Sequence, residues 1–402
     1  MAPARHVIIA GAGIAGLTAT LALARAGIRV TVFEQAEKLE ETGAGLQLSP
    51  NATRVLIALG LRERLETVAV APQAIRVMAG GSGREIVRIP LGDEMELRYG
   101  APYWSMHRGD LQSALVEAVQ REQDVNLQLG VRVEDFAAHV KGISVLGKRG
   151  TQVLDERGVA LIGADGIWSS VAARLSPPQQ LMFRHRTAWR ALISADAAPE
   201  EFCQPVVHLW LGHDAHLVHY PVKAGRLINI VCIVHDEWSE TGWSTAGDRA
   251  EMLRHFVRWA WSEKARTLIT IPDRWLKWAL YDRTDPFRGG KAPVTLIGDA
   301  AHPMLPFLAQ GAGMAIEDAA VLADMLGKYL DDPSDALRAY EGARWHRTLR
   351  AQHYSRRQGR IYELSGPEAF IRNLAMRAMG GVKLRARYDW LYSWQPPERY
   401  RL

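Results

Sequence analysis

One segment of this chain combines residue types and spacing that suit the binding of a nucleotide. Between Leu296 and Asp318 an apolar run ends at Gly298-Asp299, and a loop with prolines leads to Gly311-Ala312-Gly313 and a helical pattern that begins near Met314. A carboxylate at a strand end suits a sugar hydroxyl. A glycine-bearing helix start suits an anionic ligand, because its free N–H groups and its dipole face the ligand.

A second segment, from Asp214 to Pro221, has side chains suited to proton transfer. Alternate residues of a strand share a face, so His216 and Tyr220 point to one side and His219 to the other. Histidine titrates near neutral pH and accepts a proton directly or through water. A satisfied structural histidine is the alternative, and we prefer it for His219.

The elements that must position these residues begin near the N-terminus. An apolar strand from Val7 to Ala10 runs directly into a glycine turn, and a helical pattern and a second strand follow. In such a unit Gly11 permits the tight turn, Gly13 lets a pyrophosphate approach the backbone, and Gly16 lets the helix pack on the sheet. Glu34, at the end of the second strand, would take the ribose hydroxyls. The unit predicts nucleotide binding without choosing between NAD and FAD.

Three further segments narrow that choice. Residues 161–171 contain Asp165-Gly166, for which a plain turn is the alternative interpretation. Residues 43–51 contain Gly45-Leu46-Gln47. Residues 107–111 contain Arg108, which is alternatively a surface charge paired with Asp110.

Together with the Asp299 segment, these stretches resemble motifs of the single-component FAD-dependent aromatic-ring monooxygenases, which include salicylate, 3-hydroxybenzoate and 6-hydroxynicotinate hydroxylases. The resemblance covers essentially the whole chain. It implies FAD as cofactor, NADH or NADPH as reductant and O2 as co-substrate. One oxygen atom would reach an aromatic ring through a flavin C4a-hydroperoxide, which survives where water is excluded. No second GxGxxG appears for NADH or NADPH, as is usual in this family, but Ala172 stands where the family usually has Arg.

The resemblance also assigns roles by position. His216 and Tyr220 match a catalytic His–Tyr pair, in which a base helps to convert a phenol to the more reactive phenolate. Arg190, Pro306 and Gln47 would line the substrate pocket, although a strand-end charge and a loop proline are alternatives for the first two. Cofactor contacts are expected from Gly11, Gly13, Ala15, Gly16, Glu34, Gly45, Leu46, Arg108, Asp165, Asp299, Pro306, Gly311, Ala312, Gly313 and Met314.

Composition sets the broad class of the protein. The 402 residues are 48% hydrophobic and 23% charged, which is typical of a globular protein, and the net charge of +5 does not indicate nucleic acid binding. The two cysteines form no metal-ligand or disulfide pattern and fit a reducing cytoplasm. No apolar run is long enough to span a bilayer, and the apolar N-terminus carries nucleotide-binding glycines that a signal peptide would not need. We expect a cytoplasmic enzyme without a metal and without stable membrane association, as a monomer or homodimer.

The predicted fold is α/β: a Rossmann-like FAD-binding domain of the p-hydroxybenzoate hydroxylase type, an antiparallel β-sheet substrate domain and C-terminal helices. Strand-like runs from Trp189 to Ile193, Val206 to Trp210, His216 to Val222 and Leu227 to Val234 predict the antiparallel sheet. The motifs are far apart in sequence, so both domains must be discontinuous. We expect the FAD-binding domain from residues 1–75, 101–180 and 285–345, the sheet from 76–100 and 181–284, and the C-terminal helical segment from 346–402.

Near the C-terminus, residues 335–363 predict a helix with one basic face. We interpret that face as solvated, with an anion-binding or partner surface as the alternative. The aromatic tail, residues 388–394, is expected to pack against the body of the protein and not to bind ligand. The basic residues are Arg344, Arg347, Arg350, Arg356, Arg357 and Arg360.

The main hypothesis is a hydroxylase of a small phenolic or hydroxylated N-heteroaromatic acid, with loss of a carboxyl group left open. One alternative is a flavin monooxygenase or epoxidase of a bulkier polycyclic or secondary-metabolite substrate. A non-catalytic flavin-binding sensor is another. The sequence does not choose the ring, the position of hydroxylation, or NADH over NADPH.

Overall fold

The computed structural model describes residues 5–39, 44–140, 142–175, 181–242, 245–257, 261–329 and 332–402. Its first body contains a sheet of five parallel strands, and the central strands β1 and β11 are largely apolar because both faces of the sheet are covered. In spatial order these strands are β18 (Val294–Leu296), β11 (Ala160–Gly163), β1 (His6–Ala10), β2 (Arg29–Glu34) and β7 (Val125–Leu129).

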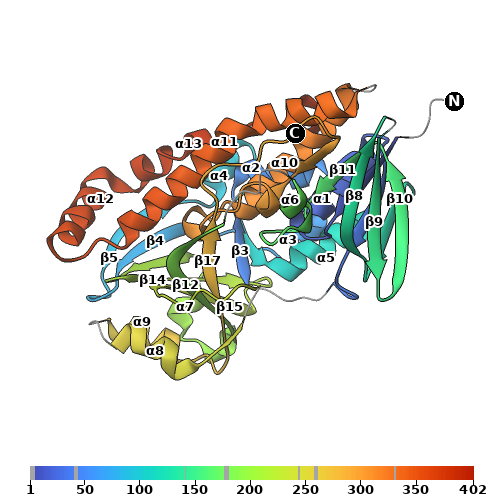
Figure 1. Ribbon diagram of the computed structural model, residues 1–402. Helices are drawn as coiled ribbons and strands as arrows, with labels where there is room; N and C mark the ends of the chain where they lie inside the picture. The colour runs from blue at the N-terminus through green and yellow to red at the C-terminus, as the bar shows by residue number, and fades with distance from the viewer. Residues whose placement is uncertain are drawn as a thin grey trace.

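Helices cover one face of this sheet, and a small antiparallel sheet covers the other (Figure 1). Leu17 and Ile316 belong to the core on the helical side, and Val133 and Val145 to the core on the opposite side. The helices are α1 (Ile14–Arg25), α5 (Arg108–Val119), α10 (Gly311–Lys328) and α11 (Pro333–Tyr362). The small sheet consists of β8 (Arg132–His139), β9 (Gly142–Arg149) and β10 (Gln152–Gly158).

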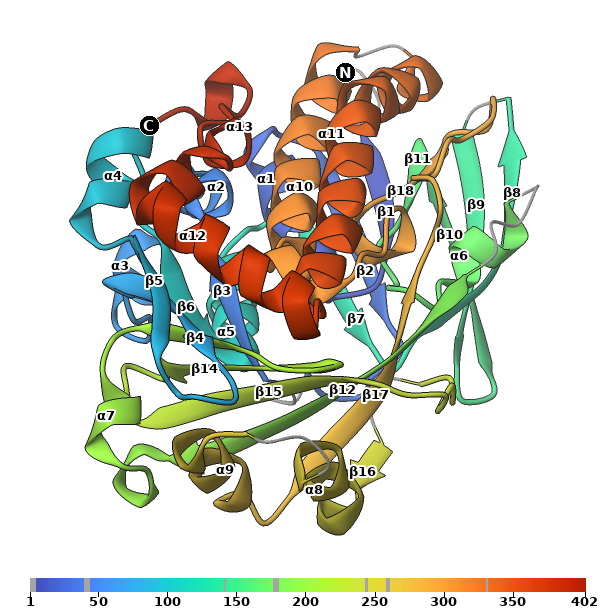
Figure 2. The ribbon, with the colours of Figure 1, turned by 90° about the vertical axis from the view of Figure 1, so that its left-hand side faces the viewer.

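A sheet of eight strands forms the second body. One face packs on α8 (Arg249–Val257) and α9 (Glu263–Thr270), and the other is turned toward the C-terminal helices (Figure 2). β4 and β13 pair in parallel, an exception within this otherwise antiparallel sheet. In spatial order the strands are β16 (Thr245–Gly247), β17 (Trp275–Asp282), β12 (Met182–Ser194), β15 (Leu227–His235), β14 (Ala215–Val222), β13 (Val207–Leu211), β4 (Ala74–Ala79) and β5 (Glu85–Pro90).

Shorter elements join these bodies. β3 (Gly45–Leu48) and β6 (Trp104–His107) form a two-stranded antiparallel ribbon. α12 (Gly366–Ala386) runs beside β5 and is broken at Gly380, where φ is +74°. The other helices are α2 (Pro50–Ala58), α3 (Arg62–Glu66), α4 (Asp93–Tyr99), α6 (Ser170–Arg174), α7 (Glu200–Cys203) and α13 (Asp389–Tyr392), with 3-10 turns η1 (Ala195–Ala197), η2 (Gly298–Ala300), η3 (Pro306–Leu308) and η4 (Glu398–Tyr400). Among the described residues, no helix has the length and apolarity needed to cross a bilayer.

The arrangement follows the predicted fold class, with differences in detail. All four strand-like runs lie in strands of the eight-stranded sheet. The expected boundary between residues 345 and 346 falls inside α11, which is continuous. The sheet of β8, β9 and β10, and helices α8 and α9, were not anticipated as separate elements.

Two histidines buried in the eight-stranded sheet predict that the protein loses stability in acid. His208 and His219 stack with ring centroids 4.4 Å apart, and neither ring nitrogen of His219 has a hydrogen-bond partner among the described residues. Burial, and secondarily Arg76, lowers the pKa of His208 to about 4; burial also lowers the pKa of His219. An unfolded histidine gains its proton near pH 6.5.

Stability should therefore fall as pH drops below about 6.5, because protons then bind the unfolded chain first. His208 is expected to remove about 2 kcal/mol from the free energy of unfolding between pH 7 and pH 5, and His219 should add to this loss. Urea unfolding at both pH values measures this loss. His219→Phe removes one titrating group, so it should lose less than the wild type; an equal loss in both proteins would contradict the account.

Candidate active site

A cavity of about 2070 Å³ joins the two bodies of the fold. Its walls come from the carboxyl ends of the parallel strands, the inner face of the eight-stranded sheet, and α11 to α13. Segments that are far apart in the sequence therefore share one site, at the strand edge where α/β folds bind ligands. Among the described residues, no group of three or more His, Cys, Asp or Glu side chains is arranged to hold a metal ion.

The glycine turn after β1 forms one end of the cavity. Gly11 has φ of +103°, and a Cβ there would lie 2.5 Å from the carbonyl oxygen of Ala164. A Cβ at Gly16, buried behind the turn, would lie 1.9 Å from the carbonyl oxygen of Gly11. A Cβ at Gly13 would meet no atom within 4 Å, and both Gly13 and Ala15 line the cavity. The turn thus leaves open the space in which a pyrophosphate would face the start of α1.

Three predicted carboxylates lie along this edge, and they differ in their free acceptor capacity. Glu34 accepts the backbone N–H of Ala12 at 2.7 Å. Asp165 is engaged by the start of α6, where it accepts the backbone N–H of Ser170 at 2.7 Å. Asp299 opens onto the cavity without a hydrogen-bond partner among the described residues, and the surrounding protein raises the pKa of its carboxyl. Asp299 is therefore the best placed of the three to accept a hydroxyl of a ligand.

Helix α10 starts at Gly311, three residues before the predicted start. Gly311 and Ala312 line the cavity, so a ligand there would meet the positive end of the helix. Gly313 and Met314 lie behind the cavity wall. The N–H of Met314 is donated to the carbonyl of Gln310 at 2.8 Å, and the cofactor contact expected from Met314 stays a prediction.

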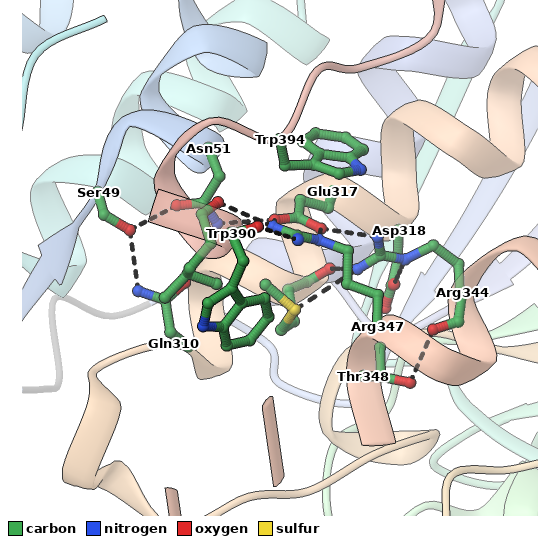
Figure 3. A network of polar contacts seen from close by, with 12 residues as sticks. Ser49, Asn51, Gln310, Glu317, Asp318, Arg344, Arg347, Thr348, Trp390 and Trp394 are labelled. Carbon is green, nitrogen blue, oxygen red and sulfur yellow. Dashed lines mark hydrogen bonds and ion pairs between the residues drawn. The ribbon is translucent and has the colours of Figure 1, made fainter. Parts of the chain in front are cut away.

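A buried polar network holds this helix start (Figure 3). Glu317 accepts hydrogen bonds of 2.7 Å from Asn51, Arg344 and Arg347. Asn51 also donates to the side-chain oxygen of Gln310 at 3.1 Å. Burial alone would raise the pKa of Glu317, but Arg347 and Arg344 outweigh it and hold that pKa below its usual value.

The neighbouring Asp318 extends the network to the loop after β18. It accepts the N–H of Gly298 at 2.9 Å, the ring nitrogen of His302 at 2.5 Å and the Nε of Arg344 at 2.7 Å. Burial opposes ionisation, but His302 and Arg344 lower the pKa of Asp318 to about 2. The network therefore fixes both the start of α10 and the loop that carries Asp299.

The C-terminal tail packs against this network (Figure 3). Arg347 donates to the carbonyls of Trp390 and Leu391 at 3.0 Å, and its guanidinium lies 5.3 Å from the ring centroid of Trp394. The interpretation of the basic α11 face as solvated is wrong for Arg344 and Arg347, because their carboxylate partners lie on α10. The tail packs on the body as expected, but three of its residues also line the cavity: Tyr388, Leu391 and Tyr392.

Replacement of Glu317 by Gln tests the importance of this network. It leaves the half-buried Arg347 without its carboxylate partner and also removes one of the two carboxylates of the buried Arg344, so the free energy of unfolding should fall by about 3–5 kcal/mol. Urea unfolding at pH 7 measures the change. Glu66→Gln is the control, because Glu66 pairs with Arg62 on the surface, where such pairs contribute less than about 1 kcal/mol. Equal losses in the two variants would argue against the network.

Across the cavity, β14 presents the predicted His–Tyr pair. His216 and Tyr220 line the cavity, whereas His219 is buried on the opposite face, as the alternation predicts. The ring of His216 lies 5.4 Å from Phe307 and 5.2 Å from Tyr362, centroid to centroid. Its Nδ1 has no hydrogen-bond partner among the described residues.

The surroundings keep both members of this pair uncharged at neutral pH. Burial, and secondarily Arg186, lowers the pKa of His216 to about 3. Burial raises the pKa of Tyr220 to about 12, although Arg190 and Gln47 oppose the rise. His216 can therefore accept a hydrogen bond, and Tyr220 can donate one.

Arg190 supplies a positive charge at the same end. Its guanidinium carbon lies 3.7 Å from the ring centroid of Trp278, and its Nε has no hydrogen-bond partner in the part of the chain that the structure describes. No described carboxylate forms an ion pair with it. Burial, and secondarily Arg108, lowers its pKa to about 10, which leaves it charged at neutral pH. An enclosed cation without a counter-ion would favour an anion in the cavity.

The ribbon of β3 and β6 completes this end. Gly45, Leu46, Gln47 and the half-buried Arg108 all line the cavity. The N–H of Gly45 donates to Asn229 at 2.7 Å, and a Cβ at Gly45 would lie 2.7 Å from the ring of Tyr220. Sequence reasoning missed Asn229; the signal was a polar residue inside the apolar run of β15.

The loop that carries Pro306 is held by α11. Ser355 donates to the carbonyl of Leu305 at 2.6 Å, and Gly359 leaves room for Phe307, whose ring would lie 2.6 Å from a Cβ there. Pro306 lines the cavity as expected. The aromatic residues that surround His216 were not predicted, because they come from η3 and α11.

This fold and site define the class of the flavin-dependent hydroxylases: a nucleotide turn and a helix start face a second sheet across a cavity with acid–base groups. The sequence profile of the FAD binding domain family matches residues 4–354. The chain belongs to this family and is an FAD-dependent aromatic hydroxylase.

Similar proteins extend along the whole chain. It is 36% identical to 3-hydroxybenzoate 6-hydroxylase 1 of Aquipseudomonas alcaligenes, covering 98% of this chain and 99% of the relative. It is also 36% identical to 3-amino-4-hydroxybenzoate 2-monooxygenase PtmB3 of Streptomyces platensis, covering 97% and 96%. A salicylate hydroxylase substrate complex superposes with a TM-score of 0.81 at 27% identity, over 98% of this chain and 97% of that one.

Proposed function

We propose that the protein uses NADH or NADPH and O2 to hydroxylate a small aromatic acid that already carries a ring hydroxyl. The observation that carries the proposal is that the nucleotide-binding edge, the neutral His216, and Arg190, which pairs with no described carboxylate, meet in one cavity. The relatives named above act on hydroxybenzoates, which have both a carboxylate and a hydroxyl.

FAD would lie along the strand edge. Gly11 and Gly13 would accommodate its pyrophosphate, Asp299 would accept a hydroxyl, and the start of α10 at Gly311 would face the negative charge of the reduced ring. When bound and reduced, FAD supplies the oxygen-transfer chemistry. The protein contributes position, charge and a dry environment.

The substrate would be held by two opposite groups. Arg190 would pair with the carboxylate, and its stacking on Trp278 restricts the orientation of the guanidinium. His216 would accept the hydrogen bond of the ring hydroxyl and so draw the substrate toward its phenolate form. Tyr220 would donate a hydrogen bond to the same oxygen or to the carboxylate.

The cavity wall around these groups would exclude water. Phe307 and Tyr362 contact the imidazole of His216, and Leu391 and Tyr392 of the tail line the same cavity. Water that enters such a site diverts oxygen transfer into side reactions. This apolar enclosure therefore supports a monooxygenase over a flavin sensor.

A second candidate is a monooxygenase of a bulkier aromatic substrate. The cavity extends along α12, where Met376 and Leu384 pack with Val77 and Leu209 of the sheet, so this extension has an apolar wall beside Arg372 and Arg385. A fused-ring hydroxy acid would fill it better than a benzoate does. The two candidates share the same cofactor and reacting groups.

Turnover of the purified holoenzyme with a panel of aromatic acids tests the proposal. We expect 3-hydroxybenzoate, a hydroxynicotinate or 1-hydroxy-2-naphthoate to accelerate oxidation of NADH or NADPH and to yield a hydroxylated product by mass spectrometry. A clear preference for the naphthoate would favour the second candidate. If no acid of the panel accelerates oxidation, the substrate class is wrong.

A further inference from the structure

Two arginines on the rim of the cavity stand apart from the other basic residues of the C-terminal helices. Arg357 of α11 and Arg387, which follows α12, are exposed and also line the cavity. Neither forms an ion pair with a described carboxylate. Other acids of the region have partners: Glu363 pairs with Arg186, Asp389 with Arg98, and Glu94 with Arg385.

Both arginines lie near one tyrosine. Burial raises the pKa of the Tyr388 phenol, and Arg387 and Arg357 both oppose the rise. The Tyr388 hydroxyl donates to Gln358 at 2.7 Å, and both side chains line the cavity. The two positive charges therefore flank the same stretch of rim, between α11 and the segment after α12.

This stretch of rim leads to the reacting groups. Tyr388 and Gln358 are electrostatic neighbours of Tyr362, and the ring of Tyr362 lies 5.2 Å from that of His216. Two aromatic side chains, Tyr388 and Tyr362, therefore lead from Arg357 to the imidazole. Inside the cavity, Arg190 is a further positive charge with which an anion from the rim could pair.

We infer that Arg357 and Arg387 form the entrance for the substrate and attract its carboxylate before Arg190 receives it. This inference rests on the proposed function, because it requires an anionic aromatic substrate. Charges on the wall of a cleft raise the association rate of an oppositely charged ligand by about 10- to 1000-fold, and salt screens the effect. A neutral ligand of the same shape gains nothing from them.

Another part of the rim offers a competing entrance. Arg274 and the exposed Leu276 line it on the β17 side, next to Trp278. It carries one arginine where the first has two, so we expect it to contribute less to the capture of an acid. Arg274→Glu separates the two routes.

The test is the association rate of 3-hydroxybenzoate with the FAD holoenzyme, followed by stopped-flow flavin absorbance at low and high salt. We expect the double variant Arg357→Glu/Arg387→Glu to associate about tenfold more slowly at low salt, with a smaller difference at high salt. The neutral 3-hydroxybenzamide should associate at the wild-type rate. Arg29→Glu/Arg149→Glu changes the net charge equally at exposed sites outside the cavity and should associate as the wild type does.

Three results would overturn the inference. The double variant could bind 3-hydroxybenzoate at the wild-type rate, or it could bind the acid and the amide more slowly by the same factor. Arg274→Glu could also slow association of the acid as much as the double variant does. If no hydroxylated aromatic acid perturbs the flavin of the wild type, the proposed function fails and the entrance fails with it. If the wild type binds and hydroxylates the acid while the double variant behaves normally, the entrance alone is wrong.

Discussion

Replacement of His216 by Ala is expected to lower kcat for hydroxylation by about 10²- to 10⁴-fold while FAD stays bound. Burial lowers the pKa of His216 to about 3, so at neutral pH its imidazole is uncharged and one ring nitrogen can accept the hydrogen bond of the substrate hydroxyl. Without it, the ring hydroxyl of the substrate would keep its proton in a dry site. The rate of product formation under saturating substrate measures kcat, and the flavin absorbance spectrum shows whether FAD stays bound.

The same pKa predicts the pH profile. A group whose pKa is depressed to about 3 stays neutral above that pH, so protonation of His216 should cause no loss of kcat/KM near pH 6.5. His219→Phe is the control for the variant, because His219 lies on the opposite face of β14. A His216→Ala enzyme with kcat close to that of the wild type would remove the assigned role.

Replacement of Arg190 by Met is expected to raise the KM for an aromatic acid by about 30-fold or more. Loss of one partner of an enclosed charge pair weakens the free energy of binding by about 2–5 kcal/mol, and each 1.4 kcal/mol changes the affinity about tenfold. The neutral amide of the same acid should bind the variant as well as the wild type. KM values for 3-hydroxybenzoate and 3-hydroxybenzamide measure the difference.

Arg190→Lys refines this prediction. Lysine keeps the charge but loses the planar fork that pairs with a carboxylate and stacks on Trp278, so its KM should fall between those of the wild type and Arg190→Met. An equal rise in KM for acid and amide in Arg190→Met would show that Arg190 supports the shape of the pocket and does not pair with the carboxylate.

Local patterns predicted the parts of the fold and site that short stretches determine. The turn at Gly11 and Gly16 leaves no room for a Cβ, so the backbone itself dictates the residue type. Alternation in β14 placed His216 on the cavity face and His219 behind it, because a strand has a period of two. The four apolar runs of the eight-stranded sheet were recognisable for the same reason.

Features that depend on distant partners were not predictable from one segment. Arg344 and Arg347 looked like a solvated helix face because their partners, Glu317 and Asp318, lie on another helix. Asp165 lines the cavity, as its cofactor motif predicts, but the motif did not show that its carboxylate also accepts the N–H of Ser170 at the start of α6. The parallel pairing of β4 with β13 joins segments more than a hundred residues apart and leaves no local signature.

The most direct test of the central claim is turnover under ¹⁸O2. Purified holoenzyme, NADH or NADPH, and an aromatic acid accepted by the site would be incubated under labelled oxygen, and the product analysed by mass spectrometry. We predict a hydroxylated product in which the new hydroxyl carries one ¹⁸O atom. A product labelled from water, or oxidation of the nicotinamide that yields only hydrogen peroxide with every acid, would contradict the assignment as a monooxygenase.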